Sequence, residues 1–374
     1  MPPSIRAIRR TPILVAVLLA ALVFAIAGCG SDGDDSSSSS TEPAATGSDS
    51  STTPTEVKDV HFVMPVPPGP DLAAYYIADE QFGPENGIKF EFDTQLVATQ
   101  GAKLIVSGQA DAFLGITTVL AVVNDAGMPL KYFRDDFVRN LTGFAVPADS
   151  DIKEIADLKG KKIGIIDAGW PIVWDPIMRA AGLEPDEYEY VVVGVGNYQA
   201  MAAGRVDAVA SWAMNWQPPN NSIEPLRYLP GSDLPEVART PSNGVMVKDE
   251  VIAEKPEWLI GLGRAISQAQ EFMKANPKCA AEIALKYVPS EEPFEVTLSQ
   301  IEAQIPYTYN KATEEHGQGY SDPQAFEYML EDMYEGGVIK TPLKAEDVID
   351  NALIPEIDDF DEQAVVEKAE ACEI

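Results

Sequence analysis

The hydrophobic and polar positions divide this chain of 374 residues into an apolar start, a polar stretch and a long patterned body. Residues 13–27 are all apolar, and residues 30–56 are dominated by Ser, Thr, Asp, Gly and Pro. The second composition cannot bury a core, so it predicts a disordered tether. From residue 57 onward, β-branched or aromatic runs alternate with helical patterns, which is typical of a largely parallel sheet with helices on its faces.

The patterned body contains two successive units of this kind. The pattern predicts strands at residues 60–64, 88–92 and 112–116 in the first unit, and at 162–166, 190–193 and 208–212 in the second. It predicts helices at residues 71–82, 101–107, 117–125, 152–158, 171–181 and 197–204. After residue 243 the pattern is helical, with helices expected at 256–275, 278–287, 294–305 and 323–334 that pack on the first sheet.

A short internal match supports two similar lobes. Residues 107–112 and 203–208 each contain a helix end, a Gly, two further residues and Asp-Ala leading into a strand. Gly can end a helix in a left-handed conformation, and Asp can hydrogen-bond the turn before the strand. We therefore expect a two-lobed α/β fold, each lobe a mostly parallel sheet flanked by helices, with a helical C-terminal extension. The first lobe would comprise residues 57–147 and 244–374, and the second 148–243.

The apolar start has the features of an export signal. Arg6, Arg9 and Arg10 precede the apolar run, which is shorter than the roughly 20 residues that a membrane-spanning helix needs. The run ends in Ile-Ala-Gly-Cys at residues 26–29, which resembles the lipobox of bacterial lipoproteins. This resemblance implies that residues 1–28 are removed, that residues 29–56 form the tether, and that Cys29 carries lipid outside the cytoplasm, at the cell membrane. An ordinary signal peptide followed by a chance cysteine is the alternative.

The charge excludes one class of partner. The formal net charge is −32, and removal of the three signal arginines would make it more negative still. Such a chain lacks the basic surface that neutralises phosphates, so we expect no nucleic-acid binding. Solubility explains the acidity, which by itself does not imply a cationic ligand.

Cysteines and histidines are few. Cys279 and Cys372 either form a disulfide, in a compartment where disulfides persist, or remain two unrelated thiols. His61 and His316 are isolated, which argues against a histidine-rich metal site and against histidine-based nucleophile systems. We expect no metal and no cofactor. The acidic pairs at residues 135–136 and 358–359 are interpreted as solvated turns.

Three strand-to-helix turns offer binding groups. Residues 194–199 resemble a dinucleotide motif, but Gln199 stands where such a site needs glycine for close packing. What remains there is a helix N-terminus, which favours negative charge, with the amide of Asn197 beside it. Similar turns occur at residues 115–118 and 167–170, and ligands of open α/β sheets gather at the carboxyl ends of strands.

Four tryptophans crowd the turns of the second unit. Trp170 adjoins Pro171, and Trp216 comes shortly before two prolines at 218–219. We expect both tryptophans to be exposed in a cleft, where an indole can stack on a planar or cationic group. For Trp174 and Trp212, a place in the core and a place in the cleft are both open.

Several segments of the chain resemble those of a known family. Residues 157–164 (DLKGKKIG) are similar to a signature that opens the second lobe of solute-binding proteins for nitrate, sulfonates, taurine and thiamine-pyrimidine precursors. Residues 107–111, residues 204–208 followed by Trp212, and residues 276–289 resemble further segments of the same family. The resemblance covers roughly residues 60–309.

The resemblance implies a type II periplasmic-binding fold whose two lobes clamp a small molecule and deliver it to an ABC permease. It implies crossings between lobes near residues 146–150 and 240–245, a monomer and no enzymatic activity. It also indicates where ligand would be held. The candidates are residues 64–71, with Met64 and Asp71 at the ends, Thr99, Thr117, Thr118, Trp170, Asn197, Trp212 and Asn215.

One departure from the family bears on the ligand. Sulfonate and nitrate binders often carry Gly-Ser where this chain has Ala-Gly-Trp-Pro at residues 168–171. The loss of a hydroxyl and the gain of an indole favour a planar organic ligand such as a thiamine-type pyrimidine. An alkanesulfonate, taurine or nitrate is the alternative ligand. A pyrimidine-synthase-like enzyme is the alternative from another class, although the cysteine cluster of those relatives is absent, and a sensor or adaptor is a third.

Overall fold

The computed structural model describes residues 57–215, 225–254, 256–288 and 292–374, all within the compact unit Thr53–Ile374. The signal, Cys29, the tether and Trp216 lie outside the described residues.

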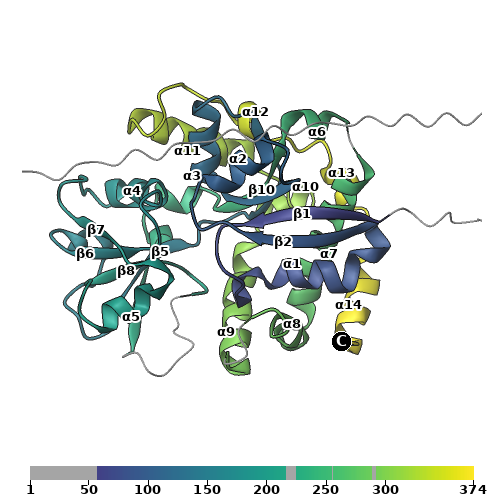
Figure 1. Ribbon diagram of the computed structural model, residues 1–374, viewed down its shortest axis with the longest axis horizontal. Coiled ribbons are helices and arrows are strands. Elements are labelled where there is room, and N and C mark those ends of the chain that lie inside the picture. Colours follow the sequence, from purple (N-terminus) through teal and green to yellow (C-terminus); the bar gives the residue numbers. More distant parts are fainter. Residues whose placement is uncertain (1–56, 216–224, 255, 289–291) are drawn as a thin grey trace, which may run out of the picture. The chain divides into compact units, whose positions relative to one another are not determined.

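The first sheet has five strands in the order β2 (Ile88–Thr94), β1 (Lys58–Met64), β3 (Ala112–Ile116), β10 (Asn243–Lys248) and β4 (Leu130–Phe137). β1 is parallel to both of its neighbours, and β10 is antiparallel to both of its own. Helices α2 (Gln100–Val106) and α3 (Thr117–Asp125) cover one face (Figure 1). Helices α1 (Ala73–Ile77) and α7 (Glu257–Ala275) cover the other (Figure 1).

The second sheet repeats this plan. Its order is β7 (Glu189–Val192), β6 (Lys162–Ile165), β8 (Ala208–Trp212), β5 (Thr142–Pro147) and β9 (Leu226–Pro230). β6 is parallel to both neighbours, whereas β5 is antiparallel to β8 and β9. Helix α4 (Pro171–Ala180) and helix α5 (Asn197–Ala202) lie over opposite faces (Figure 1). The predicted fold class, two α/β lobes flanked by helices, is confirmed.

The pairing of β5 locates the first crossing between the sheets. β5 already belongs to the second sheet, so the chain passes from the first sheet to the second within residues 138–141. The crossing was expected at residues 146–150, but these residues form the end of β5 and the segment after it, beyond the observed crossing. The return lies between β9 and β10, at residues 231–242, and the expected range of 240–245 overlaps it.

The predicted helix at residues 71–82 is divided. A 3-10 turn (Pro70–Leu72) leads into the short α1, and a π-helical turn (Ala78–Phe82) follows it. The first of these turns begins on the proline-rich stretch 65–70. Proline lacks the N–H that a regular helix would use, so helical structure begins only at Pro70.

The acidic pair at residues 135–136 is not a solvated turn. Both carboxylates are buried, near the end of β4. Asp136 pairs with the Nε of the fully buried Arg134 at 2.5 Å and accepts a hydrogen bond of 2.6 Å from the hydroxyl of Tyr75. The guanidinium also donates to Ser267, to Gln270 and to a backbone carbonyl of α7. A buried charge persists when it is paired and hydrogen-bonded, so this network joins β4 to α1 and α7.

The C-terminal extension consists mainly of short helices around the first sheet. They are α6 (Asp249–Glu254), α8 (Pro277–Ala284), α9 (Phe294–Gln304), α10 (Lys311–His316), α11 (Pro323–Glu335), α12 (Ala345–Val348), α13 (Ile354–Ile357) and α14 (Glu362–Ala371). Residues of α7, α8, α9, α13 and α14 share the apolar core beneath β1, as the helical pattern predicts.

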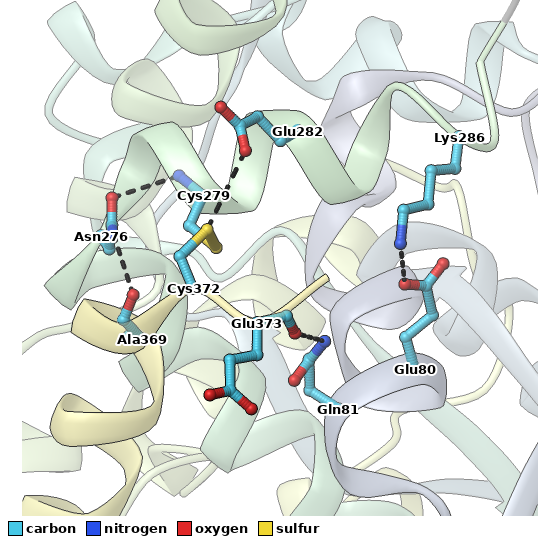
Figure 2. The surroundings of a disulfide bond; sticks show 9 residues. All are labelled: Glu80, Gln81, Asn276, Cys279, Glu282, Lys286, Ala369, Cys372 and Glu373. Atoms are coloured by element: carbon cyan, nitrogen blue, oxygen red, sulfur yellow. Dashed lines mark hydrogen bonds and ion pairs between the residues drawn. A yellow bond between two sulfur atoms is a disulfide. The ribbon is translucent and has the colours of Figure 1, made fainter.

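Cys279 and Cys372 form a disulfide, with 5.7 Å between their Cα atoms. The bond joins α8 to the end of α14 (Figure 2). Asn276 reinforces the junction, because its side chain accepts from the N–H of Cys279 at 3.1 Å and donates to the carbonyl of Ala369 at 2.8 Å (Figure 2). The alternative left open by the sequence, two unrelated thiols, is thereby excluded for this structure.

The two lobes share one apolar core. The cluster that contains Ala102 and Val119 of the first lobe also contains Trp170, Trp174 and other residues of the second. Helix α3 packs against α4. At the same side, Arg179 of α4 forms an ion pair of 2.7 Å with Asp332 of α11.

Candidate functional site

A cavity of about 320 Å³ lies between the lobes and is lined by both. The first lobe contributes residues 66–71, Val288, Glu292 and Gln300. The second lobe contributes Ile166, Val195, residues 197–199, residues 210–212 and Asn215. A small organic molecule fits a space of this size, and the presence of both lobes in its wall allows closure around it.

The strand ends explain why these residues meet. β1, β6 and β8 are parallel strands of their sheets, and the cavity residues 66–71, Ile166 and Trp212 follow or end these strands. The carboxyl ends of strands are where ligands bind in open α/β sheets.

Four of the nine residues predicted from the sequence line this cavity. They are Asp71, Asn197, Trp212 and Asn215. The other five, Met64, Thr99, Thr117, Thr118 and Trp170, do not line it.

Trp170 is fully buried rather than exposed in a cleft. Its ring packs against those of Trp174 and Trp212, with centroids 5.7 and 5.6 Å away. Its Nε1–H donates to the backbone carbonyl of Leu96, in the first lobe, at 2.9 Å. The expected stacking surface is thus occupied by protein. Of the tryptophans left open, Trp174 lies in the core, and Trp212 is partly buried with access to the cavity.

The threonines have structural partners or lie elsewhere. Thr117 is buried and donates through Oγ1 to the carbonyl of Ser242 at 2.8 Å, in the segment that returns to the first sheet. Thr117 and Thr118 line a separate small space of about 40 Å³ beside that segment. Thr99 precedes α2, and Met64 is buried in the first lobe's core.

Two carboxyl groups face the cavity from the first lobe. Burial raises the pKa of Asp71 to about 6, against the opposing effects of its own backbone N–H and of the Asn215 side chain. Burial also raises the pKa of Glu292, whose Oε1 is buried and has no hydrogen-bond partner among the described residues. A buried carboxyl group in this state gains free energy when a donor reaches it.

Two amide side chains complete the polar wall. Gln300 is 5% exposed and Asn197 is 7% exposed. Asn197 Oδ1 accepts from the N–H of Tyr198 at 2.9 Å. The hydroxyl of Tyr198 is held by Ser211 Oγ and the carbonyl of Asn215, each at 2.6 Å, which fixes its ring beside the cavity.

Sequence reasoning missed Glu292, Gln300 and Tyr198. Glu292 precedes a helix that begins at Phe294, where an acidic residue is common because it complements the helix dipole. Gln300 lies on a helix that was interpreted only as packing. Tyr198 follows Asn197 directly, so the turn at 194–199 was the available signal.

Other chemistry is not found in the part of the chain that the structure describes. No group of three or more His, Cys, Asp or Glu residues there could hold a metal ion. His61 lies 3.6 Å from Asp93, and His316 stacks on Tyr320, both outside the cavity lining. None of the described helices is long and apolar enough to cross a membrane.

Two α/β lobes of matching strand order, with a cavity between them, define the type II periplasmic-binding-protein fold. The chain belongs to the NMT1/THI5-like family, whose model matches residues 69–280. The resemblance stated from the sequence motifs is confirmed.

Individual relatives are distant. The riboflavin-binding protein RibY of Chloroflexus aurantiacus is 24% identical over 80% of this chain and 87% of its own length. A putative thiamine biosynthesis protein of Haemophilus influenzae is 24% identical over 73% of this chain and 86% of its own. A 4-amino-5-hydroxymethyl-2-methylpyrimidine phosphate synthase of Aspergillus parasiticus is 24% identical over 57% of this chain and 66% of its own.

A solved structure supports the fold. The alkanesulfonate-binding protein SsuA of Xanthomonas axonopodis superimposes with a TM-score of 0.60 at 15% identity, covering 78% of this chain and 97% of its own. At this identity the likeness concerns the arrangement of the lobes and leaves the ligand open.

Proposed function

We propose that this protein is the extracytoplasmic solute-binding component of an ABC importer. It would hold a small planar organic molecule, of the thiamine-pyrimidine type, between its lobes and present it to a permease. The observation that carries the proposal is the cavity of about 320 Å³ whose wall comes from both lobes. The family membership and the binding-protein names among the relatives support it.

Trp212 takes the stacking role that was expected of Trp170. Its ring is partly buried against Trp170 and Trp174 and lines the cavity, so it is held in place while it offers a surface to a flat ligand. Stacking of this kind contributes about 1 kcal/mol beyond the burial of area. Closure of the lobes around the guest would add the remaining contacts, because a ligand that touches both lobes favours the closed state.

The cellular location that we propose for the protein rests on the first 56 residues of the sequence. In this proposal residues 1–28 direct export and are removed, Cys29 carries lipid, and residues 29–56 tether a monomeric body to the membrane. Two acyl chains hold a protein firmly at a bilayer, at about 0.8 kcal/mol per buried CH₂. Replacement of Cys29 by Ser should release the protein from the membrane fraction.

Binding without catalysis is preferred over a synthase. The name of the Aspergillus parasiticus relative supports the enzymatic alternative. Among the described residues that line the cavity there is neither His nor Cys. Both cysteines of the described chain are joined in the disulfide.

The test is native mass spectrometry of the purified protein, which should retain a small molecule in one-to-one ratio. Trp212→Ala should lose that molecule, since the ring forms part of the wall. Trp258→Ala is the matched control, because Trp258 is also partly buried but lies on α7 of the first lobe, outside this cavity. A protein that retains no small molecule, or retains it equally in both variants, contradicts the proposal.

A further inference from the structure

The cavity between the lobes is lined by two carboxyl groups and by no cation. Asp71 and Glu292 face it, and among the described lining residues none is Lys, Arg or His. The segments 216–224 and 289–291, which follow Asn215 and precede Glu292 in the sequence, contain none of these residues either. An anion entering the cavity would lose its hydration and meet only like charge, which costs free energy.

Several backbone N–H groups that could take the place of a cation are engaged within the chain. At the turn before α5, the N–H of Tyr198 is already bound by Asn197 Oδ1. At the turn before α4, the N–H of Gly169 donates to Asp167 Oδ1 at 2.9 Å. In the first lobe, the N–H of Gly69 donates to the hydroxyl of Tyr76 at 3.2 Å. One N–H at each of these turns is therefore bound within the chain and is not available to an oxyanion.

Acceptors, in contrast, are free. The Oε1 of Glu292 is buried and has no partner among the described residues. The carboxyl group of Asp71, with its raised pKa, also lacks a charged partner in the cavity. A ligand N–H directed at Glu292 would supply the missing hydrogen bond, and one directed at Asp71 would add to the bond from Asn215. Hydrogen bonds to ionised acceptors are stronger than those to neutral ones.

Two amide side chains in the cavity wall, one from each lobe, are placed to form hydrogen bonds with the same ligand. Gln300 of α9 makes no side-chain hydrogen bond among the described residues, although it is almost completely buried. Asn197, in the second lobe, uses its oxygen locally and leaves its NH₂ group for the cavity. Buried polar groups without partners in a cavity wall indicate positions that a ligand fills.

We propose that Glu292 and Gln300, together with Asp71, select a neutral or cationic planar ligand that donates N–H hydrogen bonds, such as an aromatic amine or amidine, and that the site rejects sulfonate and nitrate. The inference rests on the proposed solute-binding function and narrows its ligand class. Asp71 lies within residues 69–280, whereas Glu292 and Gln300 lie beyond the family match.

Isothermal titration of the purified full-length protein tests this. The probes are 4-amino-5-hydroxymethyl-2-methylpyrimidine, ethanesulfonate and nitrate. We expect the pyrimidine alone to bind. Glu292→Gln should weaken its binding about tenfold or more, since a hydrogen bond to a charged acceptor contributes about 1.5–3 kcal/mol.

Glu295→Gln is the matched control, because Glu295 is exposed on the first turn of α9 and does not line the cavity. Its affinity for the pyrimidine should equal that of the unaltered protein. The melting temperature of each variant without probe reports its folding separately.

Tighter binding of ethanesulfonate or nitrate than of the pyrimidine overturns the inference and leaves the solute-binding function standing. Equal affinity of the Glu292→Gln variant and the unaltered protein overturns it as well. Binding of none of the three probes also overturns it, and retention of a small molecule in the native mass spectrum then decides the proposed function independently.

Discussion

The two lobes share a strand order but are stabilised by different means. The first lobe contains a buried ionic network around Arg134 and a disulfide that closes its last helix onto α8. The second lobe has a small core of its own beneath α5, made of Ala145, Ala200, Met201, Val206 and Val209. On its α4 face it shares an apolar core with the first lobe. The comparison indicates that the first lobe is stabilised from within, whereas the second depends on its contact with the first. We call the first lobe the frame and the second the partner lobe.

Loss of the disulfide should have the largest effect. The bond joins residues 93 positions apart, and closing a loop of that length stabilises a fold by roughly 4–5 kcal/mol in the chain-entropy model. The Cys279→Ser, Cys372→Ser double variant should therefore lose several kcal/mol in guanidinium unfolding. Amide hydrogen exchange should quicken in α8 and α14 while β6 and β8 keep their protection. Equal acceleration in both lobes would remove the distinction between frame and partner.

The next effect should come from Asp136→Asn. This change leaves the guanidinium of Arg134 buried without its counter-ion, which costs about 3–5 kcal/mol. Asp249→Asn is the control. Asp249, on α6, pairs at 3.0 Å with Lys131 of the same strand β4, but its side chain is half exposed. Exposed pairs contribute about 1 kcal/mol or less. Chemical unfolding measures the free energy of unfolding of both variants. Similar losses would show that the buried ion pair stabilises the fold no more than the exposed one.

A pH effect should distinguish the cavity wall of the first lobe. Burial raises the pKa of Asp71 from its ordinary value of 3.8 to about 6 in the folded state. The folded state therefore takes up the proton first as pH falls, and this residue makes folding more favourable between pH 6 and pH 4 than at pH 7. Glu292, in the same cavity, acts in the same direction.

The measurement compares melting temperatures of the unaltered protein and Asp71→Asn without ligand. At pH 7.5 the variant should melt higher, because it has no desolvated charge, and the difference should shrink by about pH 5. A variant that melts lower at pH 7.5, or a difference independent of pH, would mean that a donor already satisfies Asp71.

The smallest effect is expected at the contact between α4 and α11. Arg179 and Asp332 are both partly exposed, so Arg179→Met should cost less than about 1 kcal/mol of stability. Because the pair joins the two lobes, its loss should favour their separation. Tryptophan emission should then shift to the red, since Trp170 is covered by Leu96 of the first lobe. Unchanged emission would indicate that the shared apolar core alone holds the lobes together.

Much of the fold could be predicted from the sequence because its strands are short apolar runs with clear turns. β3 and β6 were predicted in this way, whereas β4 was missed. Arg134, Asp135 and Asp136 interrupt the apolar pattern of β4, and only the contacts with α1 and α7 make their burial favourable. A local pattern cannot contain that information.

The site could be predicted in part for the same reason. Asp71, Asn197, Trp212 and Asn215 lie at or after strand ends, where topology alone directs attention. Glu292 and Gln300 reach the cavity from the C-terminal helices, whose position depends on long-range packing. Trp170 was misjudged because the backbone carbonyl that satisfies its indole belongs to Leu96, 74 residues earlier.

The discontinuity of the first lobe has a consequence for how the polypeptide matures. Its sheet needs β1, which precedes the second lobe, and β10, which follows it, and its disulfide uses Cys372, which also follows the second lobe. Chains emerge from the ribosome in order, so the strands of the second lobe are all available while that cysteine is still unsynthesised. The first lobe is thus completed later than the second lobe that depends on it.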